Sequence, residues 1–264
     1  MAILRLLGET YLSQGRIAEG VALIEHSLET LRQAPNTSGR TLGAALRSLS
    51  TAYSVQGRYP EAEALLDESL QMDREPGQNE LGRADTMLAL GHIYLLKHDT
   101  GRAIPLLQKA VHIFEIHDDS HLPNALSELG AAALQEGKYA IAREDLSRAL
   151  DIDQKLFGWD HFAIALLQGG LAETYLGERN YGQAAALIQQ ALATSRTSPG
   201  ESHFAVAKLL MVEASIEAKQ RHASEADAHY RQALEIFRKT FAAGHPDLVR
   251  AQQQYTQFTK SLRK

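Results

Sequence analysis

The sequence has no cysteine, which excludes disulfides, thiolate metal sites and cysteine nucleophiles. No stretch approaches 18 consecutive apolar residues, and the first five residues lack the basic head and apolar run of a signal peptide. Aromatic residues make up 6% of the chain, too few for a surface that stacks bases, and the net charge of −5 comes without a basic run. These absences predict a cytoplasmic protein that binds neither nucleic acid nor membrane.

Motifs that carry catalysis are also missing. The chain has no Gly-x-Gly-x-x-Gly, Walker or Gly-x-Ser-x-Gly pattern. One stretch is rich in metal-ligating residues, but it lacks the His-Glu-x-x-His spacing of zinc proteases; its members are His112, Glu115, His117, Asp118, Asp119 and His121. We therefore predict that the protein is not an enzyme and has no cofactor and no metal site.

The sequence does have a repeated triplet, small–large–small, at positions i, i+4 and i+7 of a helix. The copies are Gly20/Ile24/Ser27, Ala62/Leu66/Ser69, Ala103/Leu107/Ala110, Ala142/Leu146/Ala149, Ala184/Ile188/Ala191 and Ala226/Tyr230/Ala233. They start 42, 41, 39, 42 and 42 residues apart, and another small residue stands twelve positions before each. Self-similarity at such a period is typical of stacked repeat proteins, in which each repeat packs on its neighbours.

Each repeat reads as two helices joined by a short turn. Leu4, Leu7 and Tyr11 show the apolar spacing of the first helix, and the triplet occupies one face of the second. Glycine fills the turn slot in three copies, where a positive φ is expected; the slot is held by Gly15, Gly57, Gly137 and, in the other copies, by His98, Arg179 and Arg221. We expect the second group to carry strain or a different cap. The recurring His161, His203 and His245 are interpreted as helix-entry or packing residues.

The predicted fold is all-α: a right-handed superhelical α-solenoid of about six helix–turn–helix pairs plus a C-terminal capping helix. One domain, 1–264, would comprise repeats 1–39, 40–80, 81–121, 122–160, 161–202 and 203–244 and a capping helix over 245–264. The capping helix carries an apolar stripe that includes Leu248, Ala251 and Phe258. The N-terminal edge has no such cap, so we expect either self-association or coverage by another domain there, or a chain that is a fragment.

The motifs Leu-Gly-x-x-Tyr, Gly-x-Tyr and Ala-x-x-x-large-x-x-Ala-Leu resemble the tetratricopeptide repeat over essentially the whole chain. The added length and the loops at 158–161, 200–203 and 244–247 are similar to the kinesin-light-chain type. This resemblance implies a protein-interaction scaffold. Where kinesin light chains present paired asparagines, this chain has Arg5/Leu6, Arg47/Ser48, Leu88/Ala89, Ser127/Glu128, Gly169/Gly170 and Met211/Val212. The resemblance thus implies the fold without that peptide specificity.

Helix geometry selects the residues of the first helices that face away from the second helices and toward a concave groove. The partner-binding residues predicted in this way are Arg5, Glu9, Arg47, Thr51, Leu88, His92, Leu96, Asn124, Gln135, Glu173, Lys208 and Met211. Arg5 and Arg47 would form a basic spot, and Leu88 and Leu96 an apolar strip. The alternative is that these leucines seal contacts with a neighbouring helix and the arginines are ordinary surface charge. Small residues at Ser127, Ala131, Gly169 and Gly177 predict a wide groove in repeats four and five.

The predicted function is that of a scaffold binding a peptide or protein segment in the concave groove. The expected ligand is an extended or helical peptide with an acidic group near Arg5 and Arg47 and an apolar side chain on Leu88 and Leu96. The alternative is a regulatory or sensor segment of a larger multidomain protein, whose superhelix changes shape when a ligand binds.

Overall fold

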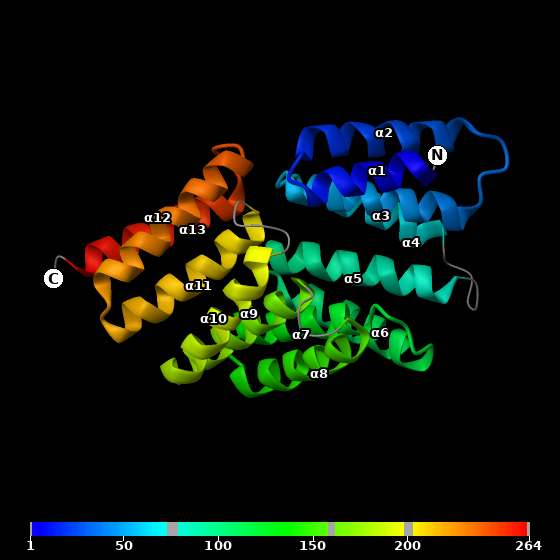
Figure 1. The fold of residues 1–264 in the computed structure, drawn as a ribbon. Helices are drawn as coiled ribbons and strands as arrows, with labels where there is room; N and C mark the ends of the chain where they lie inside the picture. The colour runs from blue at the N-terminus through cyan, green and yellow to red at the C-terminus, as the bar shows by residue number, and fades with distance from the viewer. Residues whose placement is uncertain (1, 73–78, 158–161, 198–202, 263–264) are drawn as a thin grey trace. The chain divides into compact units, whose positions relative to one another are not determined.

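The computed structural model describes residues 2–72, 79–157, 162–197 and 203–262, and over these residues the chain is all-α, with thirteen helices and no strand (Figure 1). The predicted fold class is therefore confirmed. No helix in the described ranges is long and apolar enough to cross a membrane. The chain divides into two compact units, Met1–Gln135 and Glu136–Lys264. The single continuous domain stays a prediction, and each unit is described by itself.

Unit 1 (residues 1–135) holds seven helices. They are α1 (Ala2–Ser13), α2 (Ile17–Gln33), α3 (Gly39–Val55), α4 (Tyr59–Met72), α5 (Glu80–Leu96), α6 (Thr100–Ile116) and α7 (Leu122–Gln135). α1 pairs with α2, α3 with α4 and α5 with α6, and each pair packs on the next. Successive first helices also touch, α1 with α3, α3 with α5 and α5 with α7, whereas the described backbones of successive second helices make no comparable contact. The first helices therefore form the inner side of this unit.

Unit 2 (residues 136–264) holds six helices. They are α8 (Tyr139–Phe157), α9 (Phe162–Gly177), α10 (Tyr181–Thr197), α11 (Phe204–Gln220), α12 (Ala223–Thr240) and α13 (Pro246–Ser261). α9 pairs with α10 and α11 with α12, while the first helices α9 and α11 contact each other. α13 packs on α12 through buried Leu248, Ala251 and Phe258, in agreement with a capping helix. Within the described residues, both units are thus built from paired helices that pack on the next pair.

The repeated triplets form the contact surfaces of the helix pairs. Every member of the six triplets is buried, and the large middle residues are at most 4% exposed; these are Ile24, Leu66, Leu107, Leu146, Ile188 and Tyr230. Burying a side chain of this size contributes roughly 1.5–3 kcal/mol. The small residue of the first helix makes room for it, because a Cβ on Gly91 would lie 2.5 Å from Leu107 Cδ2. Stacking therefore depends on the alternation of small and large residues.

The turns between paired helices adopt the backbone that the sequence predicts. Gly15, Gly57 and Gly137 have φ of 77°, 76° and 70°. The non-glycine residues in the same slot adopt it too, with φ of 58° at His98, 63° at Arg179 and 67° at Arg221. A left-handed conformation costs a residue with a Cβ about 1–2 kcal/mol, so three turns keep the helix-pair geometry at the expense of local strain.

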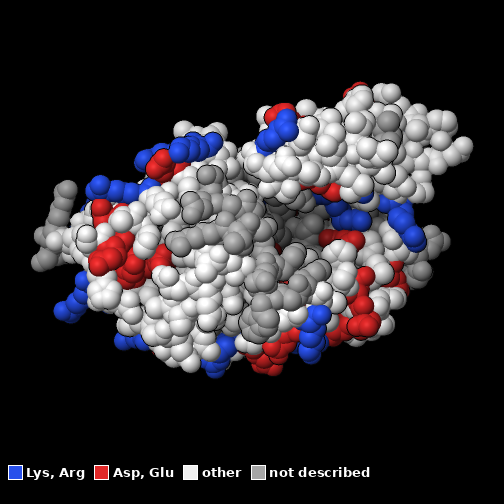
Figure 2. All heavy atoms as spheres, viewed as in Figure 1, with Lys and Arg blue, Asp and Glu red and all other residues white. Residues whose placement is uncertain are grey.

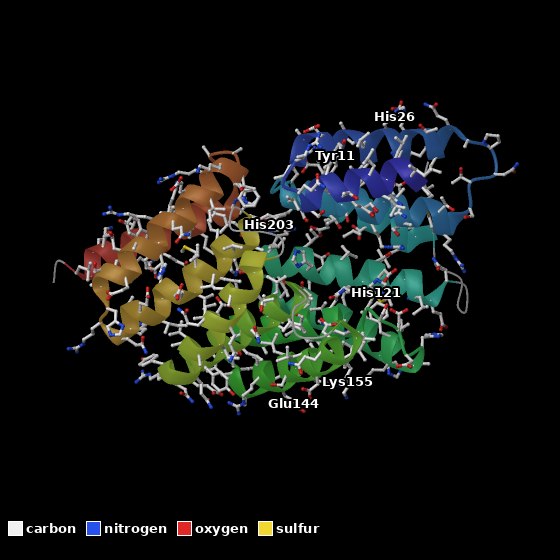
Figure 3. All side chains as sticks on the ribbon, in the orientation of Figure 1. Tyr11, His26, His121, Glu144, Lys155 and His203 are labelled. Carbon is white, nitrogen blue, oxygen red and sulfur yellow. The ribbon has the colours of Figure 1, made fainter. Side chains whose placement is uncertain are left out.

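Two recurring histidines begin helices, as the sequence predicts. His203 and His245 each accept, at Nδ1, the backbone N–H two residues onward, at distances of 3.3 and 3.2 Å. His245 is buried and stacks on Phe241 with ring centroids 3.8 Å apart. His203 stands at the start of α11 (Figure 3) beside Phe204, which contacts Phe241. The predicted counterpart, His161, lies outside the described residues.

The first helix exposes apolar side chains that its counterparts bury. Leu7 is 39% exposed, while the equivalent Leu49 and Leu90 are 4% and 2% exposed. Ile3 and Leu6 are 79% and 51% exposed. Leu49 and Leu90 are covered because α2 packs on α3 and α4 packs on α5.

Candidate functional site

The inner face of unit 1 consists of side chains on α1, α3, α5 and α7 that lie away from the second helices. Its first contact joins α1 to α3: Arg5 Nη1 donates to Glu9 Oε1 at 2.6 Å and to Ser48 Oγ at 3.2 Å. The Ser48 hydroxyl also donates to Glu9. Arg5 is half-buried in this arrangement. The predicted basic residue is thus held in place by a neighbouring carboxylate.

The second contact joins α3 to α5 through Arg47. Its Nη1 donates to the Gly82 carbonyl at 3.2 Å and to Thr86 Oγ1 at 3.4 Å, and Nη2 lies 3.5 Å from Asp85 Oδ2. Desolvation raises the pKa of Asp85 above its usual value, although Arg47 and His121 act in the opposite direction. His121, just before α7 (Figure 3), lies 3.8 Å from Asp85. Arg47 is therefore a fixed cation beside a carboxylate that is costly to ionise.

The third contact joins α5 to α7. His92 Nδ1 lies 2.8 Å from Glu128 Oε1, and Gln135 Nε2 donates to the Leu95 carbonyl at 3.0 Å. Every pair of neighbouring first helices in unit 1 is thus bridged by polar side chains. Arg5 lies beside Glu9 and Arg47 beside Asp85, so each of these cations has a carboxylate next to it. On the face drawn in Figure 2, acidic and basic side chains are likewise interspersed.

The other predicted residues of this face differ in accessibility. Leu88 and Leu96 are half-buried and pack against a core cluster that contains Leu90 and Ile93. They therefore serve packing, as the alternative interpretation expects, while part of each side chain stays accessible. Thr51 and Asn124 are exposed.

In unit 2 the predicted residues Glu173, Lys208 and Met211 lie on α9 and α11. Glu173 is exposed, and within the described part of the chain no hydrogen bond or direct ion pair engages it. Desolvation nevertheless raises the pKa of Glu173, and the more distant cations Lys208 and Arg250 only partly oppose this effect. Glu173 is thus a carboxylate without a fixed partner at a place where protein weakens its hydration.

Lys208 forms an ion pair with a carboxylate of α13, the capping helix. Its Nζ lies 3.3 Å from Asp247 Oδ2, and Arg250 Nη1 lies 4.0 Å from Asp247 Oδ1. Desolvation opposes ionisation of Asp247, but Lys208, His245 and Arg250 together hold the pKa of Asp247 below its usual value. Lys208 of α11 and Arg250 of α13 are therefore both paired with Asp247, in contrast to Glu173.

Two expectations about unit 2 need correction. Met211 is only 7% exposed, so it belongs to the core and is not reachable from solvent. Gly169 and Gly177 do not widen a groove, because large side chains of neighbouring helices fill the space beside them. A Cβ on Gly169 would lie 2.5 Å from Leu209, and one on Gly177 would lie 2.1 Å from the Tyr139 ring.

Sequence reasoning missed several members of these contacts, namely Ser48, Glu128, Asp247 and Arg250. Ser48 and Glu128 stand at positions where kinesin light chains carry asparagine, and here they bond to the neighbouring first helix. Asp85 has the inward helical offset of Ala2 and Ala44, three residues before Leu88, so its position on this face follows from spacing. Which of these groups pair with one another does not follow from spacing.

The sequence pattern of the tetratricopeptide repeat matches residues 1–75, 42–116 and 121–197, and a second version of that pattern matches residues 214–247. These ranges cover most of the chain. The chain belongs to the tetratricopeptide repeat family. A comparison with curated proteins finds no match.

Solved structures share the fold at low sequence identity. A putative kinesin light chain with nearly identical repeats from Podosopora anserina is 20% identical, with a TM-score of 0.58, over 78% of this chain and 99% of that one. A Rap protein complexed with Competence and Sporulation Factor is 11% identical, with a TM-score of 0.70, over 98% and 74%. The Signal Transduction ATPase with a tetratricopeptide repeat sensor from Pyrococcus horikoshii is 17% identical, with a TM-score of 0.64, over 96% and 36%. These likenesses show that the chain shares the helical-repeat fold of those proteins.

Proposed function

We propose that this protein is a non-catalytic interaction scaffold that binds a peptide or protein segment on the inner faces of its units. The observation that carries the proposal is the set of polar bridges between successive first helices of unit 1. These bridges fix Arg5, Arg47 and His92 before any partner arrives, while each side chain stays partly exposed. Fixed side chains lose little rotamer freedom on binding, which favours affinity.

The chemistry of the ligand follows from the accessible groups. Arg5 and Arg47 are partly exposed cations on the inner face of unit 1, so an acidic group of the ligand would bind beside them. The accessible parts of Leu88 and Leu96 would contact an apolar side chain of the same segment. In unit 2 the carboxylate of Glu173, which no described residue engages, would receive a cationic group. We therefore propose an acidic and an apolar element in the segment bound by unit 1, and a basic element in the segment bound by unit 2.

A partner capture experiment tests this proposal. Thr51 is exposed one turn beyond Arg47, so Thr51→Glu places a negative charge on the inner face without removing a packed group. We expect Thr51→Glu and Arg47→Glu to lose capture of partners from the native host, and Leu88→Asp to lose it with the helical spectrum intact. Lys109→Glu, an exposed change on the second helix α6, is the matched control and should retain capture. Equal capture by all four variants would contradict the proposal.

The second candidate function is a sensor segment of a larger protein. It is supported by the similarity to the Pyrococcus horikoshii protein, whose repeats are described as a sensor and of which this chain spans 36%. A sensor predicts a change of shape when the ligand binds, whereas a plain scaffold predicts little change. Small-angle scattering with and without a captured partner distinguishes the two. The exposed Ile3, Leu6 and Leu7 further support self-association through α1, which light scattering of an Ile3→Lys variant would test.

A further inference from the structure

A tyrosine near the end of several first helices joins its helix to the second helix of the preceding pair. Its hydroxyl donates to a carboxylate there. Three contacts have this form: Tyr53 of α3 with Glu25 of α2 at 2.8 Å, Tyr94 of α5 with Glu63 of α4 at 3.0 Å, and Tyr255 of α13 with Asp227 of α12 at 2.7 Å. The contact therefore recurs in both units.

The contact is replaced by another where the preceding helix lacks the carboxylate. α8 has Arg143 at the position that Glu63 holds in α4, counted from the triplet. Within the described residues no carboxylate accepts from Tyr175 of α9, and Arg143 donates to Glu178 of α9 instead. The tyrosine contact thus depends on an acidic residue in the helix that packs on it.

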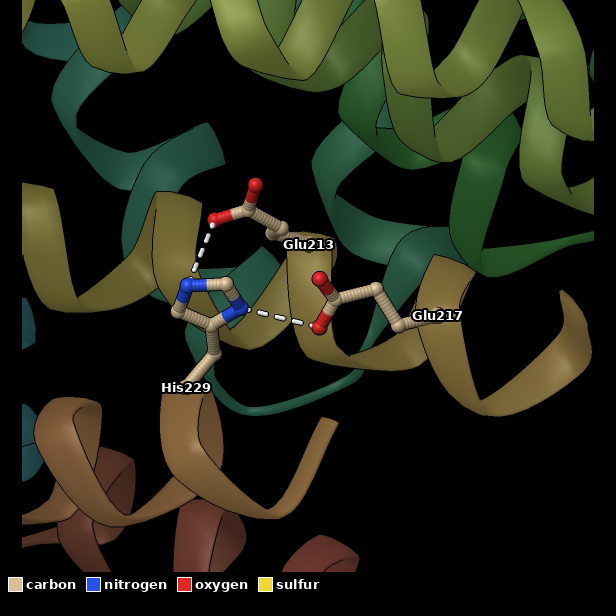
Figure 4. A group of neighbouring side chains, drawn as sticks. All are labelled: Glu213, Glu217 and His229. Carbon is tan, nitrogen blue, oxygen red and sulfur yellow. Dashed lines mark hydrogen bonds and ion pairs between the residues drawn. The ribbon is translucent and has the colours of Figure 1, made fainter. Parts of the chain in front are cut away.

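α11 has Glu217 in place of the tyrosine, and this carboxylate is bonded within its own helix pair. His229 of α12 lies between two carboxylates (Figure 4), with Nδ1 2.8 Å from Glu217 Oε2 and Nε2 3.6 Å from Glu213 Oε2. Gln189 of α10 donates to Glu213, so the α10–α11 contact uses an amide in place of a carboxylate. These groups are therefore already paired.

α1 carries the same tyrosine without an acidic partner. Tyr11 (Figure 3) is half-buried, and within the described part of the chain no carboxylate accepts from its hydroxyl. The guanidinium of Arg16 lies 3.8 Å from its ring centroid, and arginines lie over the corresponding rings of α3 and α5. At α5 the stacked Arg102 also donates to Glu63, at 3.2 Å. A hydroxyl beside a cation favours a carboxylate at Tyr11 in the same way.

Apolar side chains continue this face of α1 toward the start of the helix. Ile3, Leu7 and Tyr11 are spaced by four residues and so lie along one side of α1. Ile3 is 79% exposed and Leu7 39%. The counterparts of Leu7 are Leu49 and Leu90, which α2 and α4 cover. The uncovered side of α1 thus combines an apolar surface with a hydrogen-bond donor.

The occupied contacts specify the kind of helix that fits this side of α1. On α2, Leu28 follows Glu25 by one turn and belongs to the same apolar cluster as Leu49. Because the tyrosine follows the leucine on a first helix, whereas the carboxylate precedes the leucine on α2, the two helices run antiparallel. A fitting helix therefore lies antiparallel to α1, with an acidic residue at Tyr11 and an apolar residue one turn later at Leu7.

A second copy of this chain does not offer such a helix. Over the described ranges each second helix already packs on the first helix that follows it: α2 on α3, α4 on α5, α6 on α7, α8 on α9, α10 on α11 and α12 on α13. A second copy would have to give up one of these contacts to cover α1. Self-association through α1 would therefore use a different contact from the one described here.

We propose that the side of α1 formed by Ile3, Leu7 and Tyr11 binds an amphipathic helix of a partner protein, and that a carboxylate of this helix accepts from the Tyr11 hydroxyl. The partner helix takes the place on α1 that α2 takes on α3. This surface is separate from the inner faces, so the proposal is independent of peptide binding there.

The probe is a peptide with the α2 sequence, residues 17–33, because α2 makes this contact on α3. A covalent link between the exposed positions of Ala22 and His26 keeps it helical, since short helices are marginal in water. Fluorescence anisotropy of the labelled peptide, titrated with the full chain, should show saturable binding. Ile3→Lys should abolish it. Tyr11→Phe should weaken it about 10-fold, the effect of one hydrogen bond to a charged group.

A double-variant cycle identifies the contact between the two helices. The peptide variant Glu25→Ala should bind the wild-type chain about 10-fold more weakly. It should bind the Tyr11→Phe chain no more weakly than the unchanged peptide does. Tyr53→Phe is the matched control, because it removes the same hydroxyl where α2 already covers it, and it should leave peptide binding unchanged. Circular dichroism shows whether each chain is folded, and the peptide variant requires no change in the chain.

The proposal is overturned if the wild-type chain does not bind the peptide, if Ile3→Lys or Tyr11→Phe binds it as tightly, or if the effects of Tyr11→Phe and Glu25→Ala add. Two other occupants give their own results. Self-association that Ile3→Lys abolishes, without any binding of the peptide, would assign this side of α1 to a second copy. Binding by the 264-residue chain but not by the protein isolated from its host would assign it to another segment of the same protein. Either result would overturn the proposal.

Discussion

Gly8 of α1 lies so close to Ile24 of α2 that a Cβ on the glycine would be 2.6 Å from Ile24 Cγ1. The same Cβ would be 2.8 Å from the carbonyl oxygen of Gly20, which is backbone and cannot rotate away. The two helices of the first pair therefore touch at a place that tolerates no side chain. The small–large–small pattern is therefore explained by close contact between paired helices, where a large side chain of one helix packs against a small residue of the other.

Gly8→Ala is expected to lower the free energy of unfolding by about 1–3 kcal/mol, because the added methyl group overpacks a buried contact. Urea denaturation measures the loss. Gly39→Ala is the matched control, since Gly39 starts α3 and a Cβ there meets nothing within 4 Å. It should leave stability unchanged or raise it by up to about 1 kcal/mol. Equal effects of the two changes would show that the close approach is not required.

Arg221→Gly is expected to stabilise the protein by about 0.5–1 kcal/mol. Arg221 has φ of 67° in the turn between α11 and α12, and glycine relieves the strain of a Cβ there at some cost in chain entropy. The reverse change, Gly137→Ala, should cost about 1 kcal/mol, since Gly137 has φ of 70° with open space around it. Thermal unfolding of the two variants should therefore shift in opposite directions.

Glu173→Gln is expected to raise the free energy of unfolding at pH 7. Desolvation raises the pKa of Glu173 in the folded protein, so ionisation of this side chain opposes folding once the pH exceeds the pKa of the unfolded chain. At a pH below that value the wild-type carboxyl is protonated in both states, and the gain should vanish. Urea denaturation at pH 3.5 to 7.5 follows the difference (values about 1 unit below and well above the usual glutamate pKa). Glu144→Gln, an exposed change on α8, is the control and should show no comparable gain.

The same variant links stability to function. If Glu173 receives a cationic group of the partner, Glu173→Gln should bind more weakly while folding more stably. Weaker binding by a less stable protein would instead indicate a structural role. The comparison therefore separates a carboxylate kept for binding from one kept for packing.

His245→Phe and His245→Asn are expected to separate the two roles of this residue. Phenylalanine keeps the stacking on Phe241 and loses the acceptor for the Asp247 N–H, which should cost about 1 kcal/mol. Asparagine keeps an acceptor and loses the ring contact, worth about 0.5–1.5 kcal/mol beyond the area it buries. Denaturant unfolding of both variants measures the two losses. If either variant were as stable as the wild type, the corresponding role would be contradicted.

The order of helices, the buried triplets and the positive-φ turns followed from the sequence alone. Each of these features depends on residues within one helix pair, where spacing of three, four or seven residues sets the direction of a side chain. That is why Ile24 and Leu107 could be assigned to the core, and why Arg221 could be placed in the same turn slot as Gly57. Local periodicity carries this information completely.

Only the tertiary structure decided which groups on the inner faces meet and which are available. The contacts of Arg5 with Ser48 and of Arg47 with Asp85 join helices of neighbouring repeats, so they depend on how each helix pair is rotated against the next. The same rotation buries Met211, which helical spacing alone assigned to the inner face. The cluster of His229 with Glu213 depends on the register of α12 against α11. Such registers are fixed by packing over many residues, and no local pattern in the sequence expresses them.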